Sequence, residues 1–330
     1  MIDTDVKVLA AGIANTLEKH VEEEVDNHPL WASRYLSSKP EAVYKTHLDF
    51  LNAGSDVFST FTYQASVAGF VEHQKTSEAE AVGLIKRSVE LAKRAIRDYK
   101  LENRHRLDRL TNPEPLVAGS VGSYAAYLHD GSEYSGPSYA HQKNLDHILE
   151  WHKMRIDALV EAGADFLAIE TCPAAREAQL LLDYLGAHHP EAKAWVAFSC
   201  KNDGKSIVDG SSFKETALQL YRKSKPGQLI GLGANCIPPK DTTPLLKSLS
   251  QRETGVFIPL VAYPNSGETF CTETGKYIKS CVHYPPEEFV KEWLDLGVRY
   301  IGGCCRTTTD DIKRVSTQVQ NWKKLHSPTT

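Results

Sequence analysis

Short apolar runs alternate with amphipathic stretches along almost the whole chain, and this alternation is the feature that most restricts the fold. Eight β-rich runs are found, each is followed by a stretch with helical spacing, and no linker-like change in composition interrupts them. The pattern predicts one (β/α)8 barrel, an α/β fold that covers residues 1–330 as a single domain. The predicted strands are residues 6–11, 56–63, 116–120, 166–173, 195–199, 229–234, 256–262 and 299–302.

The main alternative architecture is an open, doubly wound sheet, which needs fewer strands and usually has a glycine-rich phosphate loop after the first one. Here Gly12 is followed by Ile13, Ala14 and Asn15, so the GxGxxG fingerprint is missing and the barrel is favoured. One connection, residues 121–139, is longer than usual, which is typical of a lid or a binding loop. The expected helices are residues 13–25, 41–51, 77–101, 141–162, 174–185, 213–223, 243–249, 286–296 and 310–324.

Composition excludes several classes of protein. The 330 residues are 41% hydrophobic and 24% charged, as in ordinary globular proteins, and the net charge of −4 does not favour nucleic acid or anionic membranes as partners. There is no apolar stretch of about 18 residues and no signal-peptide pattern at the amino terminus, so a cytoplasmic location is expected. Seven cysteines in a chain of this length are unlike a small disulfide framework and predict reduced thiols.

Two adjacent cysteines, Cys304 and Cys305, stand at the end of the last predicted strand, directly after two glycines. Neighbouring side chains on a strand point to opposite faces, so both thiols can reach one ion only where the chain bends, and the glycines permit that bend. A third cysteine, Cys236, closes the sixth predicted strand. Three thiolates with an open fourth position are typical of catalytic zinc, whereas a structural site is closed by four protein ligands. We therefore predict a catalytic Zn²⁺ site at these three cysteines.

Other interpretations of these residues stay open at this point. Buried cysteines are commonly inert small hydrophobes, so the three thiols could serve packing alone. Cys281 or His283 could donate a further ligand, although a catalytic zinc needs its fourth position free. Gly302 and Gly303 could bind a phosphate group, but the two bulky thiols that follow make this weaker.

Polar residues at the other predicted strand ends are candidates for substrate binding, because the active site of a barrel lies at the carboxyl ends of its strands. Glu170 follows four apolar residues, and a buried carboxylate must be paired or hydrogen-bonded; it either anchors a substrate ammonium group or forms an ion pair with Arg or Lys. Asn235 either binds substrate or holds the backbone of Cys236. The candidates are Gly12, Thr60, Glu170, Ser199, Asn235 and Tyr263.

Several short motifs are found along the chain: Gly302-Gly303-Cys304-Cys305-Arg306, Gly233-Ala234-Asn235-Cys236, Pro29-Leu30-Trp31-Ala32, His47-Leu48-Asp49-Phe50, Thr60-Phe61-Thr62-Tyr63-Gln64-Ala65-Ser66, Ile169-Glu170-Thr171-Cys172-Pro173 and Tyr263-Pro264-Asn265. Taken together, these motifs resemble those of the homocysteine S-methyltransferases, a family of zinc-dependent barrel enzymes, and the resemblance covers nearly the whole chain. It is closer to the S-methylmethionine-using branch than to the betaine-using branch. The chain also stops soon after the last predicted helix, without the oligomerising extension of the betaine enzymes, so a monomer is expected.

The resemblance implies transfer of a methyl group from a sulfonium donor, S-methylmethionine or S-adenosylmethionine, to the sulfur of homocysteine, which gives methionine. It also implies that this sulfur is the fourth ligand of the zinc ion and that no protein residue acts as nucleophile. Glu170 is then expected to hold the ammonium group of homocysteine. Asn235, Ser199 and Thr60 are expected to position substrate, and Tyr63 and Tyr263 to face the positive sulfur of the donor.

One position departs from the family pattern. Family members usually have Asp-Gly-Gly or Asp-Gly-Ala where the first strand ends, and that Asp helps to hold the amino group of homocysteine. This chain has Ala10 there, so Glu170 is left to hold the ammonium group largely alone. An alternative interpretation is therefore a non-catalytic or altered-substrate zinc-binding relative.

Overall fold

A computed structural model describes residues 5–10, 12–26, 28–103, 114–271, 276–278 and 285–326. Eight parallel strands form one sheet, in the order β1-β10-β7-β6-β5-β4-β3-β2. The two ends of this order also meet, because Leu9 pairs with Val57 and the Asp56 nitrogen donates to the Val8 oxygen at 2.7 Å. The strands are β1 (Lys7–Val8), β2 (Val57–Ser59), β3 (Leu116–Gly122), β4 (Phe166–Cys172), β5 (Ala194–Phe198), β6 (Leu229–Asn235), β7 (Leu260–Tyr263) and β10 (Val298–Ile301).

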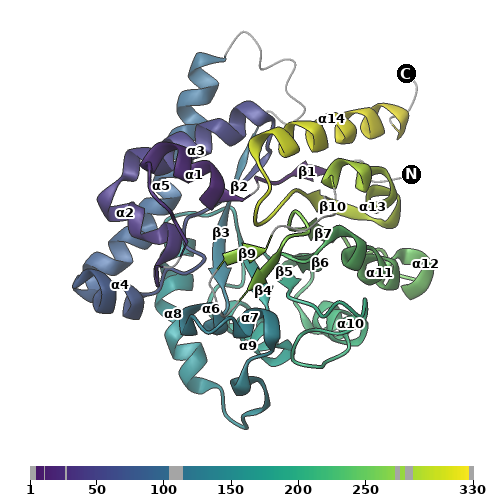
Figure 1. Cartoon of the computed structure of the whole chain (residues 1–330). Coiled ribbons are helices and arrows are strands. Elements are labelled where there is room, and N and C mark those ends of the chain that lie inside the picture. Colours follow the sequence, from purple (N-terminus) through teal and green to yellow (C-terminus); the bar gives the residue numbers. More distant parts are fainter. Residues whose placement is uncertain are drawn as a thin grey trace.

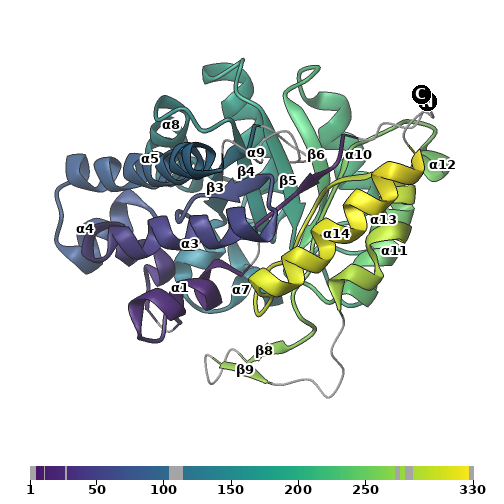
Figure 2. The same ribbon diagram turned by 90° about the horizontal axis from the view of Figure 1, so that it is seen from above.

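Helices surround this sheet, which confirms the predicted (β/α)8 barrel (Figure 1). The longest, α5, begins at a capping box in which the Ser77 nitrogen donates to the Glu80 carboxylate at 2.8 Å. None of the described helices is both long and apolar enough to cross a membrane. The helices that follow the strands include α1 (Ile13–Val21), α3 (Pro40–Ala53), α5 (Glu78–Glu102), α8 (Asp146–Glu161), α9 (Ala175–His188), α10 (Phe213–Lys223), α11 (Pro239–Leu249), α13 (Val290–Leu296) and α14 (Thr309–His326). Figure 2 shows α3, α5 and α14 along the outside of the barrel.

The interior of the barrel is filled by side chains, and their alternation determines what reaches its rim. In β4, Phe166 and Ala168 belong to the inner cluster, whereas Leu167 and Ile169 belong to the outer core shared with the helices. Glu170 continues the inner face at the carboxyl end of this strand. Phe166 packs against Trp195 with ring centroids 5.0 Å apart, so aromatic side chains help to fill the interior below that carboxylate.

Several predicted boundaries were wrong. The predicted strands 6–11, 56–63 and 256–262 are shorter in the structure, as β1, β2 and β7. The β-rich composition beyond Ser59 does not extend β2, because there the Thr60 hydroxyl accepts the Ser120 nitrogen at 2.9 Å and the chain turns. The helix predicted at 13–25 ends at Val21, where Glu22 adopts a left-handed φ of 58°.

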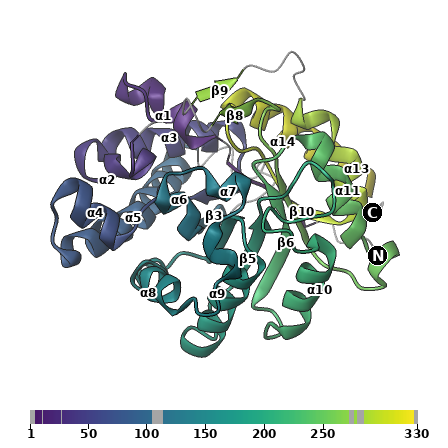
Figure 3. The same ribbon diagram turned by 60° about the horizontal axis from the view of Figure 1, so that its bottom comes forward.

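The segment 121–139, expected as a loop, contains helical turns instead. This segment, rich in glycine and tyrosine, lacks the apolar periodicity that predicts a helix. Ser123 nevertheless caps its first helical turn by accepting the Ala126 nitrogen at 3.3 Å. The helix predicted at 141–162 begins only at Asp146, because a separate helical turn that ends at His141 precedes it. Figure 3 shows α6 and α7 near the end of the barrel where the strands finish. The elements are α6 (Tyr124–Leu128), α7 (Ser132–Ser135) and η3 (Ser138–His141).

Other short elements were also missed, because a single turn or a short hairpin leaves little periodicity in a sequence. The predicted helix 286–296 is divided between a short turn and α13. The missed elements are η1 (Trp31–Arg34), α2 (Tyr35–Ser38), α4 (Val67–Gln74), α12 (Gln251–Thr254), η4 (Pro286–Glu288) and the antiparallel pair β8 (Thr269–Cys271) and β9 (Lys276–Ile278).

Candidate functional site

The three predicted cysteine ligands lie together at the carboxyl ends of β6 and β10. The sulfur of Cys236 lies 3.2 Å from that of Cys305, the sulfurs of Cys304 and Cys305 are 3.9 Å apart, and all three are within 4.8 Å of one another. Both segments are tied to the end of β7, which lies between them in the sheet: the Cys236 nitrogen donates to the Tyr263 oxygen (3.1 Å) and the Cys304 nitrogen to the Pro264 oxygen (2.7 Å).

The spacing of the sulfurs fits a metal ion. In a tetrahedral zinc site with Zn–S bonds of about 2.3 Å, sulfurs are about 3.8 Å apart. Hydrogen bonds from Cys304 and Cys305 lower the pKa of Cys236 well below its usual range, whereas sharing its proton with these neighbours raises the pKa of Cys304. Two further groups contact the sulfurs. The Tyr134 hydroxyl lies 3.6 Å from the Cys236 sulfur, and the Asn235 amide nitrogen lies 3.9 Å from the Cys304 sulfur. Such contacts orient and stabilise thiolate ligands.

The glycines beside the cysteines are needed for close packing. A Cβ on Gly302 would lie 2.7 Å from the Leu9 Cβ, and one on Gly303 would collide with the Thr307 hydroxyl. At Gly12 a Cβ would lie 2.8 Å from the Cys304 oxygen, which accepts the Gly12 nitrogen at 3.0 Å. The glycines thus let the cysteine turn approach the first strand, and this accounts for them without a phosphate group.

Backbone strain is concentrated at the same rim. Thr171 lies near the end of β4, and Cys236 and Arg306 come after β6 and β10; each adopts a left-handed φ, of 50°, 56° and 63°. A left-handed φ at a non-glycine residue costs free energy. Such conformations persist where the surrounding structure holds them, most often at functional sites. These backbone conformations support a functional role for the rim, and the sequence alone could not reveal them.

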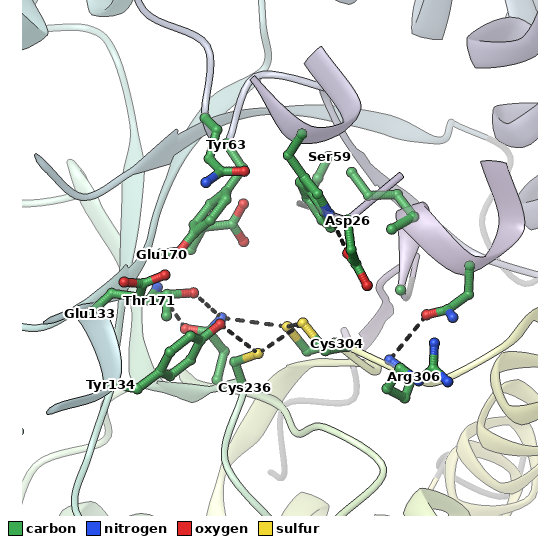
Figure 4. Close-up of a pocket in the computed structure, with 18 of the residues that line it drawn as sticks. Asp26, Ser59, Tyr63, Glu133, Tyr134, Glu170, Thr171, Cys236, Cys304 and Arg306 are labelled. Atoms are coloured by element: carbon green, nitrogen blue, oxygen red, sulfur yellow. Dashed lines mark hydrogen bonds between the residues drawn. The ribbon is translucent and has the colours of Figure 1, made fainter. Parts of the chain in front are cut away.

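The thiols open onto a cavity of about 410 Å³, a size typical of small-molecule sites. Figure 4 shows Glu133, Tyr134, Thr171 and Glu170 on one side of it, and Asp26 and Arg306 on the other. Its wall includes four of the six candidates for substrate binding: Gly12, Glu170, Asn235 and Tyr263.

The other two candidates, Thr60 and Ser199, are buried but do not line this cavity. The Thr60 hydroxyl instead accepts the Ser120 nitrogen, and the Ser199 nitrogen donates to the Cys172 oxygen at 3.0 Å. Both residues stand where a strand ends, but their bonds support neighbouring strands. Cys281 and His283 lie outside the described residues.

Glu170 is buried, with 8% of its surface exposed, and is hydrogen-bonded by two hydroxyl groups. Ser120 donates to one carboxylate oxygen, and Tyr263 donates to the other at 3.0 Å. Burial raises the pKa of Glu170, and these two hydrogen bonds oppose that rise. No ion pair with a described Arg or Lys is found, so the open alternative of a structural salt bridge is not supported within the described ranges. The carboxylate faces the cavity with acceptor capacity to spare.

Asn235 links the ends of two strands beside the thiols. Its amide oxygen accepts the Thr171 nitrogen and its amide nitrogen donates to the Thr171 hydroxyl, each at 2.8 Å. These bonds hold the strained backbone of Thr171 next to Glu170. Asn235 therefore has a structural role, and as part of the cavity wall it also stays a candidate for substrate contact.

A fully buried polar network holds the segment that follows β3. Arg155 donates to the Gly122 oxygen at 2.6 Å and to the ring of His152 at 2.7 Å, and His152 in turn contacts Glu177 at 2.9 Å. Glu177 also accepts the Tyr124 nitrogen at 2.7 Å. Burial lowers the pKa of His152 to about 4, so its neutral ring can accept from Arg155 and donate to Glu177. Hydrogen bonds to buried side chains therefore hold Gly122 at the end of β3, and Tyr124 and Tyr139 of this segment, against α8 and α9.

The aromatic part of the cavity wall was only partly predicted. Trp31 and Tyr63 pack edge to face with ring centroids 6.1 Å apart, and the Trp31 indole donates to Asp26 at 2.9 Å. Tyr63 was expected to face the donor, and both rings line the cavity. The sequence analysis missed Tyr134 and Glu133, because their segment has no regular apolar pattern.

The short distance between Cys236 and Cys305 leads to a prediction about oxidation. When the metal-free protein is oxidised mildly, we expect a disulfide between these two residues, since their sulfurs lie 3.2 Å apart, and uptake of Zn²⁺ should stop until a reductant restores the thiols. Peptide mass mapping of the oxidised protein, with metal content measured before and after reduction, checks both parts. A bridge from either residue to Cys200 instead would contradict the geometry.

Comparisons with known proteins show the family of this chain. The family model for homocysteine S-methyltransferase matches residues 7–319. The chain is 42% identical to a betaine-homocysteine S-methyltransferase of Drosophila melanogaster, covering 93% of this chain and 92% of that protein. It is 37% identical to the homocysteine S-methyltransferase YbgG of Bacillus subtilis, over 90% of each. The metallated crystal structure of the homocysteine methyltransferase MmuM from Escherichia coli superposes with a TM-score of 0.80 and 35% identity, covering 95% of this chain and 96% of that one. The chain belongs to the homocysteine S-methyltransferase family.

Proposed function

We propose that this enzyme transfers a methyl group from a sulfonium donor to homocysteine at a zinc ion held by Cys236, Cys304 and Cys305. The observation that carries the proposal is the group of three sulfurs within 4.8 Å of one another, placed at the edge of a cavity that could admit a fourth ligand. When bound, Zn²⁺ would supply an open coordination position that accepts the homocysteine sulfur and removes its proton at neutral pH.

The residues of the cavity suit two positively charged groups. Glu170 is proposed to hold the α-ammonium group of homocysteine, because it is a buried carboxylate whose two hydroxyl donors leave lone pairs free. The rings of Trp31 and Tyr63 present aromatic surface to a cationic sulfur. The homocysteine sulfur attacks the methyl carbon of the donor while the bond from that carbon to the donor sulfur breaks. The electron pair of the broken bond stays on the donor sulfur, which thereby loses its positive charge.

Orientation explains much of the rate that this arrangement can provide. Two bound substrates held with the nucleophilic sulfur in line with the methyl carbon react as one unit, which lowers the entropic part of the barrier. The strained backbones of Thr171 and Cys236 are held by hydrogen bonds to neighbouring strands, so the cavity wall is set before substrates bind. No protein nucleophile is required.

A steady-state assay with homocysteine and S-methylmethionine, together with the metal content of the purified protein, tests the proposal. Formation of methionine with about one zinc per chain supports it, whereas zinc binding without any methyl transfer would favour the non-catalytic relative. Membership of an enzyme family does not favour that alternative.

Position 10 offers a second test, since the family's usual Asp is replaced there by Ala10, which lines the cavity. We expect Ala10→Asp to strengthen homocysteine binding by roughly tenfold or more, because a second carboxylate would share the ammonium group with Glu170. The rate of methyl transfer should change less. Calorimetric titration of both proteins with homocysteine measures the difference. An unchanged dissociation constant in a folded Ala10→Asp protein would mean that the ammonium group does not approach this position.

A further inference from the structure

A second buried carboxylate, Glu133, lines the cavity and has no assigned partner. Only 9% of its surface is exposed, and its Oε2 atom has no hydrogen-bond partner in the part of the chain that the structure describes. A buried acceptor without a partner costs free energy, so such a group in a native structure requires an explanation. A ligand in the cavity could provide the missing donor, and burial raises the pKa of Glu133 to about 7, which a cation would reverse.

The backbone holds Glu133 in place. Its helical turn, α7, begins after Gly131, whose φ of 71° suits glycine, and the Asp130 carboxylate accepts the Ser132 nitrogen at 2.9 Å. The next residue, Tyr134, places its hydroxyl 3.6 Å from the Cys236 sulfur. Glu133 and Tyr134 both line the cavity, and Figure 4 shows them on the same side of the thiols as Glu170. A charged group bound at Glu133 would therefore share the cavity with the thiols.

The other acidic groups of the wall, Asp26 and Asp130, are less deeply buried than Glu170 and Glu133, and each accepts a hydrogen bond from within the chain. Asp26 accepts the Trp31 indole at 2.9 Å, and Asp130 accepts the Ser132 nitrogen. The cationic side chain of Arg306 forms an ion pair with Glu268 at 2.9 Å. Two buried carboxylates thus remain with acceptor capacity directed into the cavity, Glu170 and Glu133.

Each carboxylate can bind a different substrate through charge-assisted hydrogen bonds only if both substrates carry an ammonium group. Homocysteine has one, and a sulfonium amino acid has a second. A betaine has a quaternary nitrogen without N–H bonds, so it would leave the Glu133 oxygen without a donor and would be recognised by aromatic faces instead. A wall with two such carboxylates would therefore distinguish two classes of methyl donor by the number of N–H donors that they bring.

We propose that Glu133 binds the α-ammonium group of the methyl donor and so makes the enzyme specific for a sulfonium amino acid rather than a betaine. The inference rests on the proposed methyl transfer to homocysteine. It assigns Glu170 to the acceptor substrate and Glu133 to the donor. Glu133 is a specificity residue and takes no part in bond making or breaking.

The test compares Glu133→Gln with wild type in the intact zinc enzyme, using three donors: S-methylmethionine, dimethylsulfoniopropionate, which is a sulfonium without an ammonium group, and glycine betaine. Loss of the charge-assisted hydrogen bond should raise the KM for S-methylmethionine by about tenfold or more. The KM for homocysteine should change less than about threefold. With dimethylsulfoniopropionate the variant should do no worse than wild type. Glu150→Gln, an exposed change on α8, is the matched control and should leave all constants unchanged.

The outcomes separate this inference from the function on which it rests. If wild type transfers no methyl group from any of the three donors, the proposed function fails. If wild type uses S-methylmethionine and Glu133→Gln raises the KM values for donor and homocysteine equally, or changes neither, the assignment of Glu133 is wrong. Better use of betaine than of S-methylmethionine by wild type would overturn it too. Calorimetric titration with S-methylmethionine supplies a readout that does not depend on turnover, and circular dichroism shows whether the variant is folded.

Discussion

Cys305→Ala should lose its zinc and reduce methyl transfer by about a thousandfold or more, while the barrel stays folded. Metal coordination contributes several kcal/mol to activation of the substrate sulfur, and two remaining thiols cannot complete the site. The fold should survive because Cys305 is only partly buried and lies at the rim, outside the three hydrophobic core clusters. Metal analysis of the purified variant, a methionine-formation assay and a thermal melt measure the three parts of this expectation.

The matched control is Cys200→Ala. Cys200 is another cysteine that stands beyond the end of a barrel strand, but it is buried and is not among the three clustered sulfurs. Its loss should cost stability, as removal of a buried side chain does, and leave the zinc content unchanged. A Cys305→Ala protein that retains one zinc per chain and full activity would show that the three-sulfur site is not the centre of the reaction.

Much of this architecture could be predicted from the sequence, because periodicity reports burial. The helix at 213–223 was predicted with the observed bounds, since its apolar face alternates regularly with charge. Strand ends were less predictable. The run 56–63 is β-rich throughout, yet β2 stops at Ser59, because hydrogen bonds to the neighbouring strand determine where the chain turns.

The clustering of the three cysteines could be predicted because they stand at strand ends, and a barrel places the carboxyl ends of all its strands at one rim. The same rule could not distinguish side chains that face the cavity from those that support it. Thr60 follows β2 and Glu170 lies near the end of β4, but only Glu170 continues the inner face of its strand into the cavity. That difference depends on the register of each strand in the closed sheet, which a single sequence does not report.

Glu133 and Tyr134 could not be found in this way. They lie on a single helical turn whose place in the cavity wall depends on buried contacts far away in the sequence. Glu177, for example, accepts the Tyr124 nitrogen across 53 positions. Only the length of the connection gave a signal, since loops of this size often carry binding residues.

The second large effect is expected for Glu170→Gln, which should raise the KM for homocysteine roughly a hundredfold. The amide fills the same space but removes the charge that attracts the ammonium group, in a buried position where water cannot compensate. Ser120→Ala is the graded control, because it removes one hydroxyl donor and keeps the carboxylate, so its effect should be about tenfold or less. Steady-state kinetics with each substrate varied in turn gives the required KM values.

The pattern across both carboxylates is more informative than either variant alone. Glu170→Gln should affect mainly homocysteine and Glu133→Gln mainly the donor, because each carboxylate is assigned to a different ammonium group. If Ser120→Ala were as harmful as Glu170→Gln, the role of Glu170 would be to hold Ser120 and Tyr263 together rather than to bind a cation. If both glutamine variants raised the same KM, the two carboxylates would share one ammonium group. A betaine, which needs no second carboxylate, would then become the better candidate for the donor.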